Sequence, residues 1–438
     1  MRHSSDRVVV AAFYYRSSHI SCVFLCNHLF VKAAVHGRLC FHNFHCMTAT
    51  PTRVLHMFCT TTAGLPLTAT GRYELEESDD GSYFLDRDGS VFGHVLAYLR
   101  DGVVAAGYER DVRMLGRLKR EFDFCCVDLL EEHELVLAAG GYDGNDNLRS
   151  VAAYDRRTDS WTESTPMLEA RLDFGMCVIA GEVYASGGFS TLGALTASVE
   201  RYSPLSNTWS SVAAMPTAIS GHGACSVNGS MYVLGGHDGQ CLQRVLKYDT
   251  GSDSWSEVAP MPAARAWAAV CAVDSDIYVI GGENNDDEPC ADVYKYNVVN
   301  NVWSLVSPMP SARAGHKACV LGGKIYAAGG FIADLTDVNS MLRYDPASDT
   351  WSEVAPMSQA RSHFGMFVAG SCIYAVGGEF NDDEERITRY LASMEKYEAE
   401  SDRWSAACSM AGPRSEFQTC VLTTQENVFD AMMRRALQ

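Results

Sequence analysis

Six double-glycine pairs, spaced almost evenly, place the strongest constraint on the fold of this chain. The pairs begin at Gly140, Gly187, Gly235, Gly281, Gly329 and Gly377, so successive pairs are 47, 48, 46, 48 and 48 residues apart. Each pair is followed by a tyrosine and, seven residues later, a tryptophan: Tyr154/Trp161, Tyr202/Trp209, Tyr248/Trp255, Tyr296/Trp303, Tyr344/Trp351 and Tyr397/Trp404. Ten residues beyond the tryptophan stand Arg171, Ile219, Arg265, Arg313, Arg361 and Arg414. A period of this length is typical of repeated supersecondary units that stack on one another.

Each repeat contains four strand candidates. In the fourth repeat these are Trp267 to Val273, Asp276 to Ile280, Asp292 to Tyr296 and Val302 to Val306. The second strand is a continuous apolar run, as expected for a strand buried on both faces, and turn-rich linkers join the third and fourth. Four-stranded antiparallel blades repeated radially form a β-propeller. The sequence therefore predicts a mainly β fold with six blades.

The two ends of the repeat region predict how the ring closes. The first repeat starts at Leu135 to Ala139 and has no first strand of its own. One further first-strand sequence, Phe417 to Leu422, follows the sixth repeat. We expect this C-terminal strand to complete the first blade, because an open ring would expose apolar faces and strand edges.

These motifs resemble the kelch family over about residues 135–422. The glycine pairs, the tyrosine-to-tryptophan spacing and the Pro-Met or Met-Pro pairs after the fourth strand (Pro166-Met167, Met215-Pro216, Pro260-Met261, Pro308-Met309 and Pro356-Met357) all match it. No Trp-Asp dipeptide occurs, which disfavours the WD40 propellers. The arginines recur too regularly to be selective, so we interpret them as structural.

Charge and cysteine content limit the partners and the compartment. The net charge is −19, but residues 1–60 carry six Arg or Lys and only Asp6, which leaves −24 on residues 61–438. This acidity disfavours nucleic acid and anionic membranes as partners. Most cysteines in the repeats stand singly on apolar strands and are expected to be small buried hydrophobes in a reducing compartment, the cytoplasm or else the nucleus (Cys177, Cys225, Cys271, Cys319 and Cys372).

Residues 1–53 are predicted to be a disordered leader, or translated sequence upstream of a start at Met47. A zinc site is the other reading, because residues 22–46 gather cysteines and histidines: Cys22, Cys26, His28, His36, Cys40, His42, His45 and Cys46. Zinc needs four ligands on a compact scaffold, and the spacing of these residues is not a familiar one. We therefore favour the leader and predict no metal and no cofactor.

A small α/β module is expected between the leader and the repeats. A strand through Tyr83 to Leu85 meets a turn at residues 86–89, and an amphipathic helix follows from Val91 to Leu99. A second helix is expected from Glu109 to Asp123. The YFLDRDG turn and the YLRDG end of the first helix resemble the BTB domain of the potassium-channel tetramerisation type, over residues 54–130. A helical cap on the repeats is the alternative reading.

This module departs from its family in two places. Residues 52–57 stand where the opening strand of the family is expected, and their sequence does not match it. Some members bind zinc through His-x5-Cys and a later Cys-Cys pair; Cys125-Cys126 is present, but Arg100 lies six residues after His94, so no zinc is expected. The domain prediction is completed by a tail at residues 423–438.

The position two residues beyond the arginine (Ile219 in the second repeat) predicts a partner site. It holds Asp173, Gly221, Trp267, Gly315, His363 and Glu416. The kelch resemblance implies that partners dock on the face formed by these residues and by the loops after the glycine pairs. Trp267 is the one tryptophan outside the repeat grid, so we predict it to be a hot-spot anchor, with inter-blade packing as the other reading. Asp173, His363 and Glu416 are predicted to lie beside it.

Two of these loops are acidic. One holds Glu283, Asp286, Asp287, Glu288 and Asp292; the other holds Glu379, Asp382, Asp383, Glu384 and Glu385. Acidic loops at the mouth would steer a basic segment toward it. Plain solvation of the loops is the alternative.

A BTB-like module before a kelch ring resembles the substrate adaptors of cullin-RING ubiquitin ligases. That resemblance implies a non-catalytic protein that self-associates and holds a cullin through the BTB module and captures a protein through the propeller. The usual long helical segment between the two parts is missing, since only residues 124–134 separate them. An oligomeric scaffold without a ligase role is the second hypothesis. A metal-dependent propeller enzyme is the third and is disfavoured, because His222, His237, His316 and His363 have no recurring carboxylate pair beside them.

Overall fold

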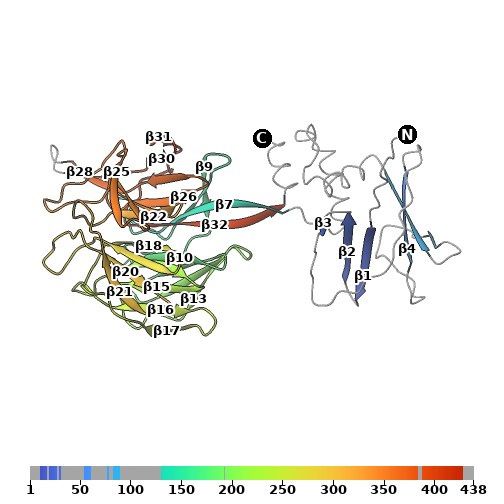
Figure 1. Cartoon of the computed structure of the whole chain (residues 1–438), viewed down its shortest axis with the longest axis horizontal. Helices are drawn as coiled ribbons and strands as arrows, with labels where there is room; N and C mark the ends of the chain where they lie inside the picture. Colours follow the sequence, from blue (N-terminus) through green and yellow to red (C-terminus); the bar gives the residue numbers. More distant parts are fainter. Residues whose placement is uncertain are drawn as a thin grey trace. The chain divides into compact units, whose positions relative to one another are not determined.

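The computed structural model describes residues 10–16, 19–26, 29–30, 54–60, 76–77, 82–88, 130–191, 193–382 and 387–427 (Figure 1). The chain divides into two compact units. One unit is Met1–Glu132 together with Gln425–Gln438, and the other is His133–Thr424. The second unit contains all six repeats.

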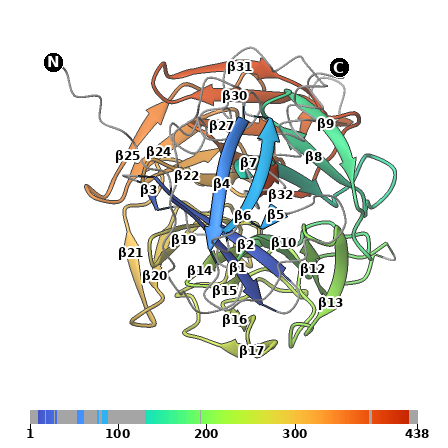
Figure 2. The same cartoon turned by 90° about the vertical axis from the view of Figure 1, so that its right-hand side faces the viewer.

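The repeats form six four-stranded antiparallel sheets, which confirms the predicted six-bladed propeller. Each sheet is one blade, and the outer strands β13, β17, β21, β25 and β31 mark the rim in Figure 2. Blade 2 consists of β10 (Gly175–Ile179), β11 (Glu182–Ser186), β12 (Val199–Ser203) and β13 (Thr208–Val212), and blade 3 of β14 (Gly223–Val227), β15 (Ser230–Leu234), β16 (Val245–Asp249) and β17 (Ser254–Glu257). Blade 4 consists of β18 (Ala269–Val273), β19 (Asp276–Ile280), β20 (Val293–Asn297) and β21 (Val302–Val306). Blade 5 consists of β22 (Lys317–Leu321), β23 (Lys324–Ala328), β24 (Met341–Asp345) and β25 (Thr350–Val354).

Blade 6 carries an additional hairpin. Its sheet consists of β26 (Gly365–Ala369), β27 (Cys372–Val376), β30 (Met394–Glu398) and β31 (Arg403–Ala407). Between β27 and β30, the strands β28 (Glu379–Asp382) and β29 (Ile387–Tyr390) pair with each other in a separate two-stranded sheet.

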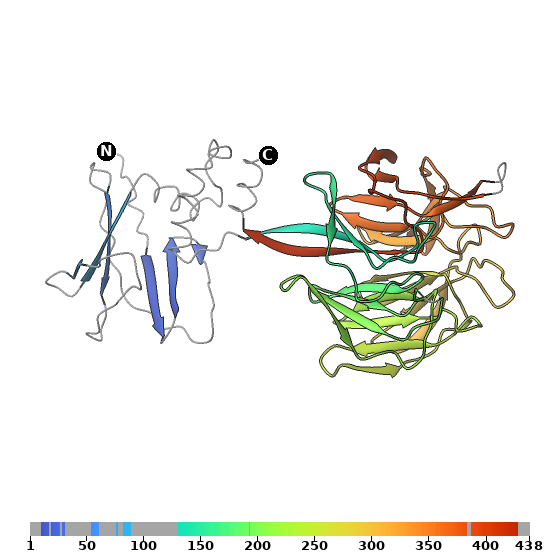
Figure 3. The ribbon, with the colours of Figure 1, turned by 180° about the vertical axis from the view of Figure 1, so that it is seen from behind.

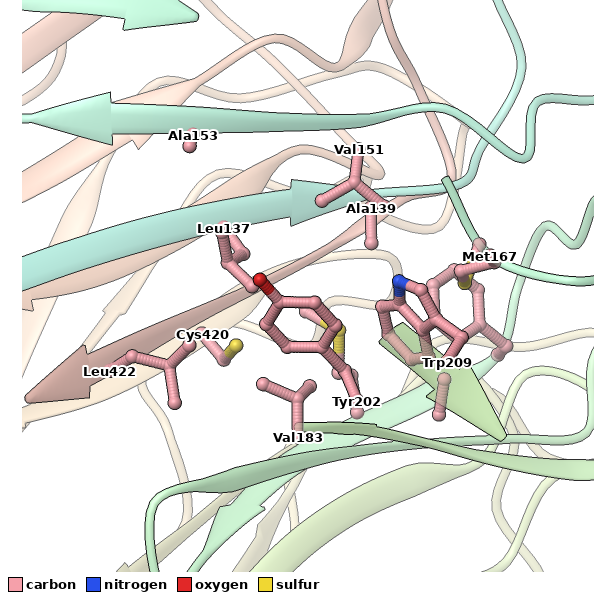
Figure 4. Packing of buried hydrophobic residues seen from close by; sticks show 13 residues of the cluster. Leu137, Ala139, Val151, Ala153, Met167, Val183, Tyr202, Trp209, Cys420 and Leu422 are labelled. Carbon is pink, nitrogen blue, oxygen red and sulfur yellow. The ribbon is translucent and has the colours of Figure 1, made fainter. Parts of the chain in front are cut away.

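Blade 1 is assembled from both ends of the repeat region, as predicted. Its strand order is β32 (Gln418–Asn427), β7 (Leu130–Ala139), β8 (Val151–Asp155) and β9 (Ser160–Ser164). Figure 3 shows β32 lying beside β7. Cys420 and Leu422 from β32 pack with Leu137 and Ala139 from β7 in a cluster that reaches Tyr202 and Trp209 of blade 2 (Figure 4). The ring is therefore closed by a strand from the end of the repeat region.

The tyrosine of each repeat makes a hydrogen bond within its blade, and the tryptophan makes one to the preceding blade. Every tyrosine hydroxyl donates a hydrogen bond to an Asp or Asn five residues later, at 2.6–2.9 Å. Every tryptophan Nε1 donates to a main-chain carbonyl of the preceding blade, and Trp161 of blade 1 reaches Cys408 of blade 6 at 2.9 Å. The fixed seven-residue offset thus places one bond within the blade and one between blades.

The arginines are structural, as the sequence predicts. In four repeats (Arg171, Arg313, Arg361 and Arg414) the buried guanidinium donates to the carbonyl of the first glycine of a pair. The glycine itself has a positive φ and no room for a side chain: a Cβ on Gly329 would lie 2.4 Å from the Arg361 carbonyl oxygen. Arg265 differs, because it pairs with the half-exposed Asp292 at 2.9 Å. Cys177, Cys225, Cys271 and Cys319 are buried and unbridged, and Cys372 is half-buried.

The described strands of the first unit form two three-stranded sheets. One contains β1 (Val10–Arg16), β2 (His19–Cys26) and β3 (Leu29–Phe30); the other has the order β4 (Val54–Thr60), β6 (Ser82–Asp88) and β5 (Glu76–Glu77). The predicted strand at Tyr83 to Leu85 lies in β6, which continues through Asp86–Asp88, where the sequence predicts a turn. The strands β1, β2 and β3 lie in the segment predicted to be a leader.

Some sequence predictions fall outside the described residues. These are the helices at 91–99 and 109–123, His28 and the cysteines and histidines from residue 36 to 46, the pair Cys125-Cys126, and residues 428–438 of the predicted tail. Within the described residues, no helix has the length and apolar character needed to cross a membrane.

Candidate functional site: the mouth of the propeller

The six positions two residues beyond the arginine (or Ile219) meet in a closed ring of main-chain hydrogen bonds. Each N–H donates to the carbonyl of its counterpart in the preceding blade, at 2.7–3.1 Å, and the Asp173 N–H donates to Glu416 to close the circle. All six residues have φ between 48° and 62°. The backbone is therefore the same in every blade, and only the side chains of this mouth ring (Asp173, Gly221, Trp267, Gly315, His363 and Glu416) differ.

The two glycines of the mouth ring make room for its largest side chains. A Cβ on Gly221 would lie 3.0 Å from the indole of Trp267, and one on Gly315 would lie 3.1 Å from the imidazole of His363. At these two positions the large side chain leans over the preceding residue, and the missing side chain of the glycine leaves room for it. This pairing is not repeated around the whole ring, because Glu416 follows His363.

Trp267 spans three blades at the mouth. Its Nε1 donates to Asp173 Oδ2 at 2.9 Å, its ring lies over Gly221, and its centroid is 5.0 Å from that of His237. Part of the indole stays exposed. Part of the Trp267 side chain therefore packs between blades, which is one of the two interpretations of the sequence. The exposed part of the indole leaves surface that a partner could contact.

Charged groups at the mouth change the pKa of His363, Glu416 and the nearby Glu379. Burial opposes protonation of His363, but Glu379, Asp173 and Glu416 outweigh it and raise its pKa to about 9. His363 Nδ1 lies 3.4 Å from Glu379 Oε1, within ion-pair distance but without hydrogen-bond geometry. Burial opposes ionisation of Glu379, yet contact with His363 and a 2.8 Å hydrogen bond from Ser415 lower its pKa. Burial and then Asp173 raise the pKa of Glu416.

Directly beneath the mouth ring is a polar axial cavity. Its wall includes Lys317, whose Nζ donates to Gln418 Oε1 at 3.2 Å and whose pKa is lowered by burial to about 8. His222 and His316 also line it, and burial keeps both neutral at pH 7, with the pKa of His222 at about 3. Their Cβ atoms pack against Gly236 and Gly330, as Phe174 does against Gly188. These histidines are therefore packing residues.

The acidic loop of blade 4 is only partly available to a partner. Asp286, Asp287 and Glu288 are exposed, and Asn284 Oδ1 fixes the loop by accepting from the N–H groups of Asp286 and Glu288. Glu283 turns inward, where burial and Asp287 raise its pKa. With Asp292 held by Arg265, three free carboxylates remain.

The acidic loop of blade 6 offers less charge than its sequence indicates. Glu379 points into the mouth toward His363 and Ser415. Asp382 lies 2.9 Å from Arg389 Nε across the β28–β29 hairpin. Asp383, Glu384 and Glu385 lie outside the described residues.

Sequence reasoning missed the aromatic residues at the mouth. The residue directly after each glycine pair forms a main-chain bridge to the residue after the arginine or Ile219, and in four blades it is aromatic: Tyr142, Phe189, His237 and Phe331. Tyr142 packs on Tyr390 at 5.4 Å, and Phe331 packs on His363 at 5.9 Å. The fixed position after the glycine pair was the signal that could have identified them.

Among the described residues, no group of three or more His, Cys, Asp or Glu side chains is arranged to hold a metal ion. The mouth presents a partly exposed tryptophan and several carboxylates on a backbone geometry that all six blades share. These features define a β-propeller whose mouth differs between blades only in its side chains.

Comparison with protein families agrees with this class. The model for the "KLHDC2/KLHL20/DRC7 Kelch-repeats domain" matches residues 221–429, the Kelch motif matches residues 133–168 and 170–216, and the BTB/POZ domain matches residues 33–131. The chain is therefore a kelch-repeat β-propeller protein with an N-terminal BTB domain. The BTB match begins at residue 33, upstream of the boundary predicted at residue 54.

Individual relatives are similar over short segments. Influenza virus NS1A-binding protein homolog B of Danio rerio is 47% identical over 53 residues, 12% of this chain and 8% of the relative. Kelch-like protein 26 of Homo sapiens is 32% identical over 129 residues, 28% and 20% of the two chains. Kelch-like protein 23 of Mus musculus is 31% identical over 85 residues, 19% and 14%. The matches thus span 20% or less of these relatives.

A solved structure, that of YjhT, supports the fold alone. It superposes with a TM-score of 0.52 at 17% identity and covers 61% of this chain and 96% of its own.

Proposed function

We propose that this chain is a non-catalytic adaptor that presents a captured protein to a cullin-RING ubiquitin ligase. The propeller mouth binds the protein to be modified, and the BTB domain self-associates and holds the cullin. The observation that carries the proposal is the mouth ring, in which one backbone geometry displays a partly exposed tryptophan beside Asp173 and Glu416. The BTB match supports the cullin-binding half.

The captured protein is proposed to present a basic segment. The exposed carboxylates of the blade 4 loop favour the approach of Lys and Arg side chains. Trp267 adds a flat aromatic surface of the kind that dominates protein interfaces. The buried free thiols fit a reducing compartment, so we place this activity in the cytoplasm or the nucleus.

Affinity capture with Trp267→Ala beside the wild-type chain tests both halves. We expect both chains to bring down a cullin, and only the wild type to bring down the basic partner. Leu205→Ser is the matched control, because Leu205 is fully exposed in the turn between β12 and β13. Failure of every form to bind a cullin would favour the scaffold hypothesis, and a partner set unchanged by Trp267→Ala would refute the mouth assignment. Metal analysis of the purified chain tests the enzyme hypothesis.

A further inference from the structure

Three of the loops at the mouth share one tight turn with a left-handed residue at the same place. In blade 2, Ser190 N–H donates to Ala194 and Gly193 N–H donates back to Ser190. The same two bonds link Asn284, Asp287 and Glu288 in blade 4, and Ile332, Leu335 and Thr336 in blade 5. The left-handed residues are Gly193 (φ 68°), Asp287 (φ 58°) and Leu335 (φ 62°). Leucine thus stands where the other two blades have residues that tolerate this conformation.

Leu335 gains no burial in return for this backbone conformation. Its side chain is 64% exposed. Among the described residues other than glycine with positive φ, only Ala180, Trp267 and Leu335 are apolar, and most of the rest are Asp or Asn. The two bulky ones, Trp267 and Leu335, both belong to the mouth. Strained residues that persist without a packing role cluster at binding sites, so the leucine requires an explanation outside the fold.

The acidic loop of blade 4 precedes the Leu335 loop around the ring, and each is fixed on its far side. Asn285 Oδ1 accepts from the Cys241 N–H of blade 3 at 2.7 Å, and Asp337 Oδ2 accepts from the Asn381 N–H of blade 6 at 2.7 Å. Among the described residues, no hydrogen bond joins the blade 4 loop to the blade 5 loop. A partner can therefore meet both loops without displacing a bond between them.

We propose that Leu335 is a specificity-determining anchor for a partner segment that carries an apolar side chain next to Lys or Arg. The apolar side chain would cover Leu335, and the basic one would lie against Asp286, Asp287 and Glu288. Charge complementarity selects this occupant, since three exposed carboxylates lie on the loop of the blade next to the one that carries the exposed leucine. The proposal rests on the proposed function, because it takes the mouth as the docking face.

The test uses the full chain and short fluorescent peptides in an anisotropy titration. The first peptide has a leucine flanked by arginines, the second replaces the leucine by serine, and the third replaces the arginines by glutamates. We expect the first to bind about tenfold more tightly than the second, the order of effect produced by covering part of a leucine side chain. It should also bind more tightly than the third, whose glutamates are repelled by the exposed carboxylates of the blade 4 loop. Leu335→Gly should remove the preference for leucine.

Two further variants separate binding from folding. Glycine accepts the left-handed backbone, so Leu335→Gly should not lower the melting temperature; Leu335→Asn, which also tolerates it, should behave alike. Leu205 is an exposed leucine whose own φ is not positive, so Leu205→Ser should leave peptide binding unchanged. The proposal is overturned if no peptide binds, if serine replaces leucine without loss, or if Leu335→Gly keeps the preference. In those cases cullin co-purification and the dependence of capture on Trp267 still test the adaptor function separately.

Discussion

The repeat grid and the mouth ring obey the same six-fold geometry but use their side chains differently. In the grid, tyrosine and tryptophan make the same two hydrogen bonds in all six blades. In the mouth ring, six residues share a backbone conformation and one pattern of main-chain bonds while their side chains range from glycine to tryptophan. The comparison teaches that one pattern of main-chain bonds closes the mouth whatever the side chains are, so the side chains there can differ from blade to blade.

The largest effect that would sharpen this comparison is expected at Arg361. Its guanidinium bonds the Gly377 carbonyl and the buried Glu395, each at 2.8 Å. Arg361→Met should lower the free energy of unfolding by about 3–5 kcal/mol, because it leaves the Glu395 carboxylate buried and unpaired. Urea denaturation measures this loss, and adding Glu395→Gln should restore part of it.

Arg265→Met is the matched control for this substitution. Its carboxylate partner Asp292 is 48% exposed, whereas Glu395 is 7% exposed. We expect a loss of only about 1 kcal/mol, since solvent can rehydrate Asp292. Equal losses of unfolding free energy for the two variants would contradict this explanation, in which burial of the carboxylate partner determines how much each arginine contributes to stability.

A smaller effect is expected when glycine is replaced in the grid. Gly329→Ala should cost about 2–4 kcal/mol, because its φ is +65° and the new methyl would meet the Arg361 carbonyl oxygen. Gly322→Ala, at φ +57° with open space around it, should cost about 1–2 kcal/mol. Thermal melts of both variants measure the difference, and identical melting temperatures would show that close approach of the backbone plays no part.

The smallest effect concerns the mouth and depends on pH. The folded-state pKa of His363 is raised to about 9, so its contribution to stability is fully present below pH 6.5 and is lost as the pH rises through 9. Glu416, with a raised pKa, adds a decline in the same direction. His363→Gln should remove at most about 3 kcal/mol of this decline.

Denaturation of both chains at pH 6 and pH 9.5 measures the difference. Glu379, Asp173 and Glu416 remain in the variant, so the part of the decline due to Glu416 should persist. Lys317, whose pKa is lowered to about 8, adds a rise in stability over this range in both chains. A decline in the variant equal to that of the wild type would therefore show that His363 is uncoupled from folding.

The fold could be predicted because its determinants repeat within one period. The tyrosine, tryptophan, arginine and glycine positions recur at nearly constant spacings along the sequence, so the repeated copies reveal them. Closure could also be predicted, since a missing first strand before Leu135 and an extra one after Phe417 leave one arrangement that satisfies both. The side chains of the mouth ring carry no such redundancy.

The details of the mouth depend on contacts between distant parts of the sequence. The bond from Trp267 to Asp173 joins residues 94 positions apart. Counting acidic residues also overstated the number of carboxylates that each acidic loop offers to a partner. In the blade 4 loop Asp292 pairs with Arg265, and in the blade 6 loop Asp382 lies against Arg389. The left-handed conformation of Leu335 could not be predicted for a different reason. The turn requires this conformation at a position where leucine disfavours it.

The pairing of β32 with β7 sets an order of events during synthesis. Blade 1 remains one strand short until residue 427 has left the ribosome, although β7 emerges almost three hundred residues earlier. At about 5–20 residues per second this interval lasts roughly fifteen seconds to a minute. Throughout this interval β7 has no partner on the side that β32 later occupies, so the last strand to be synthesised completes the first blade.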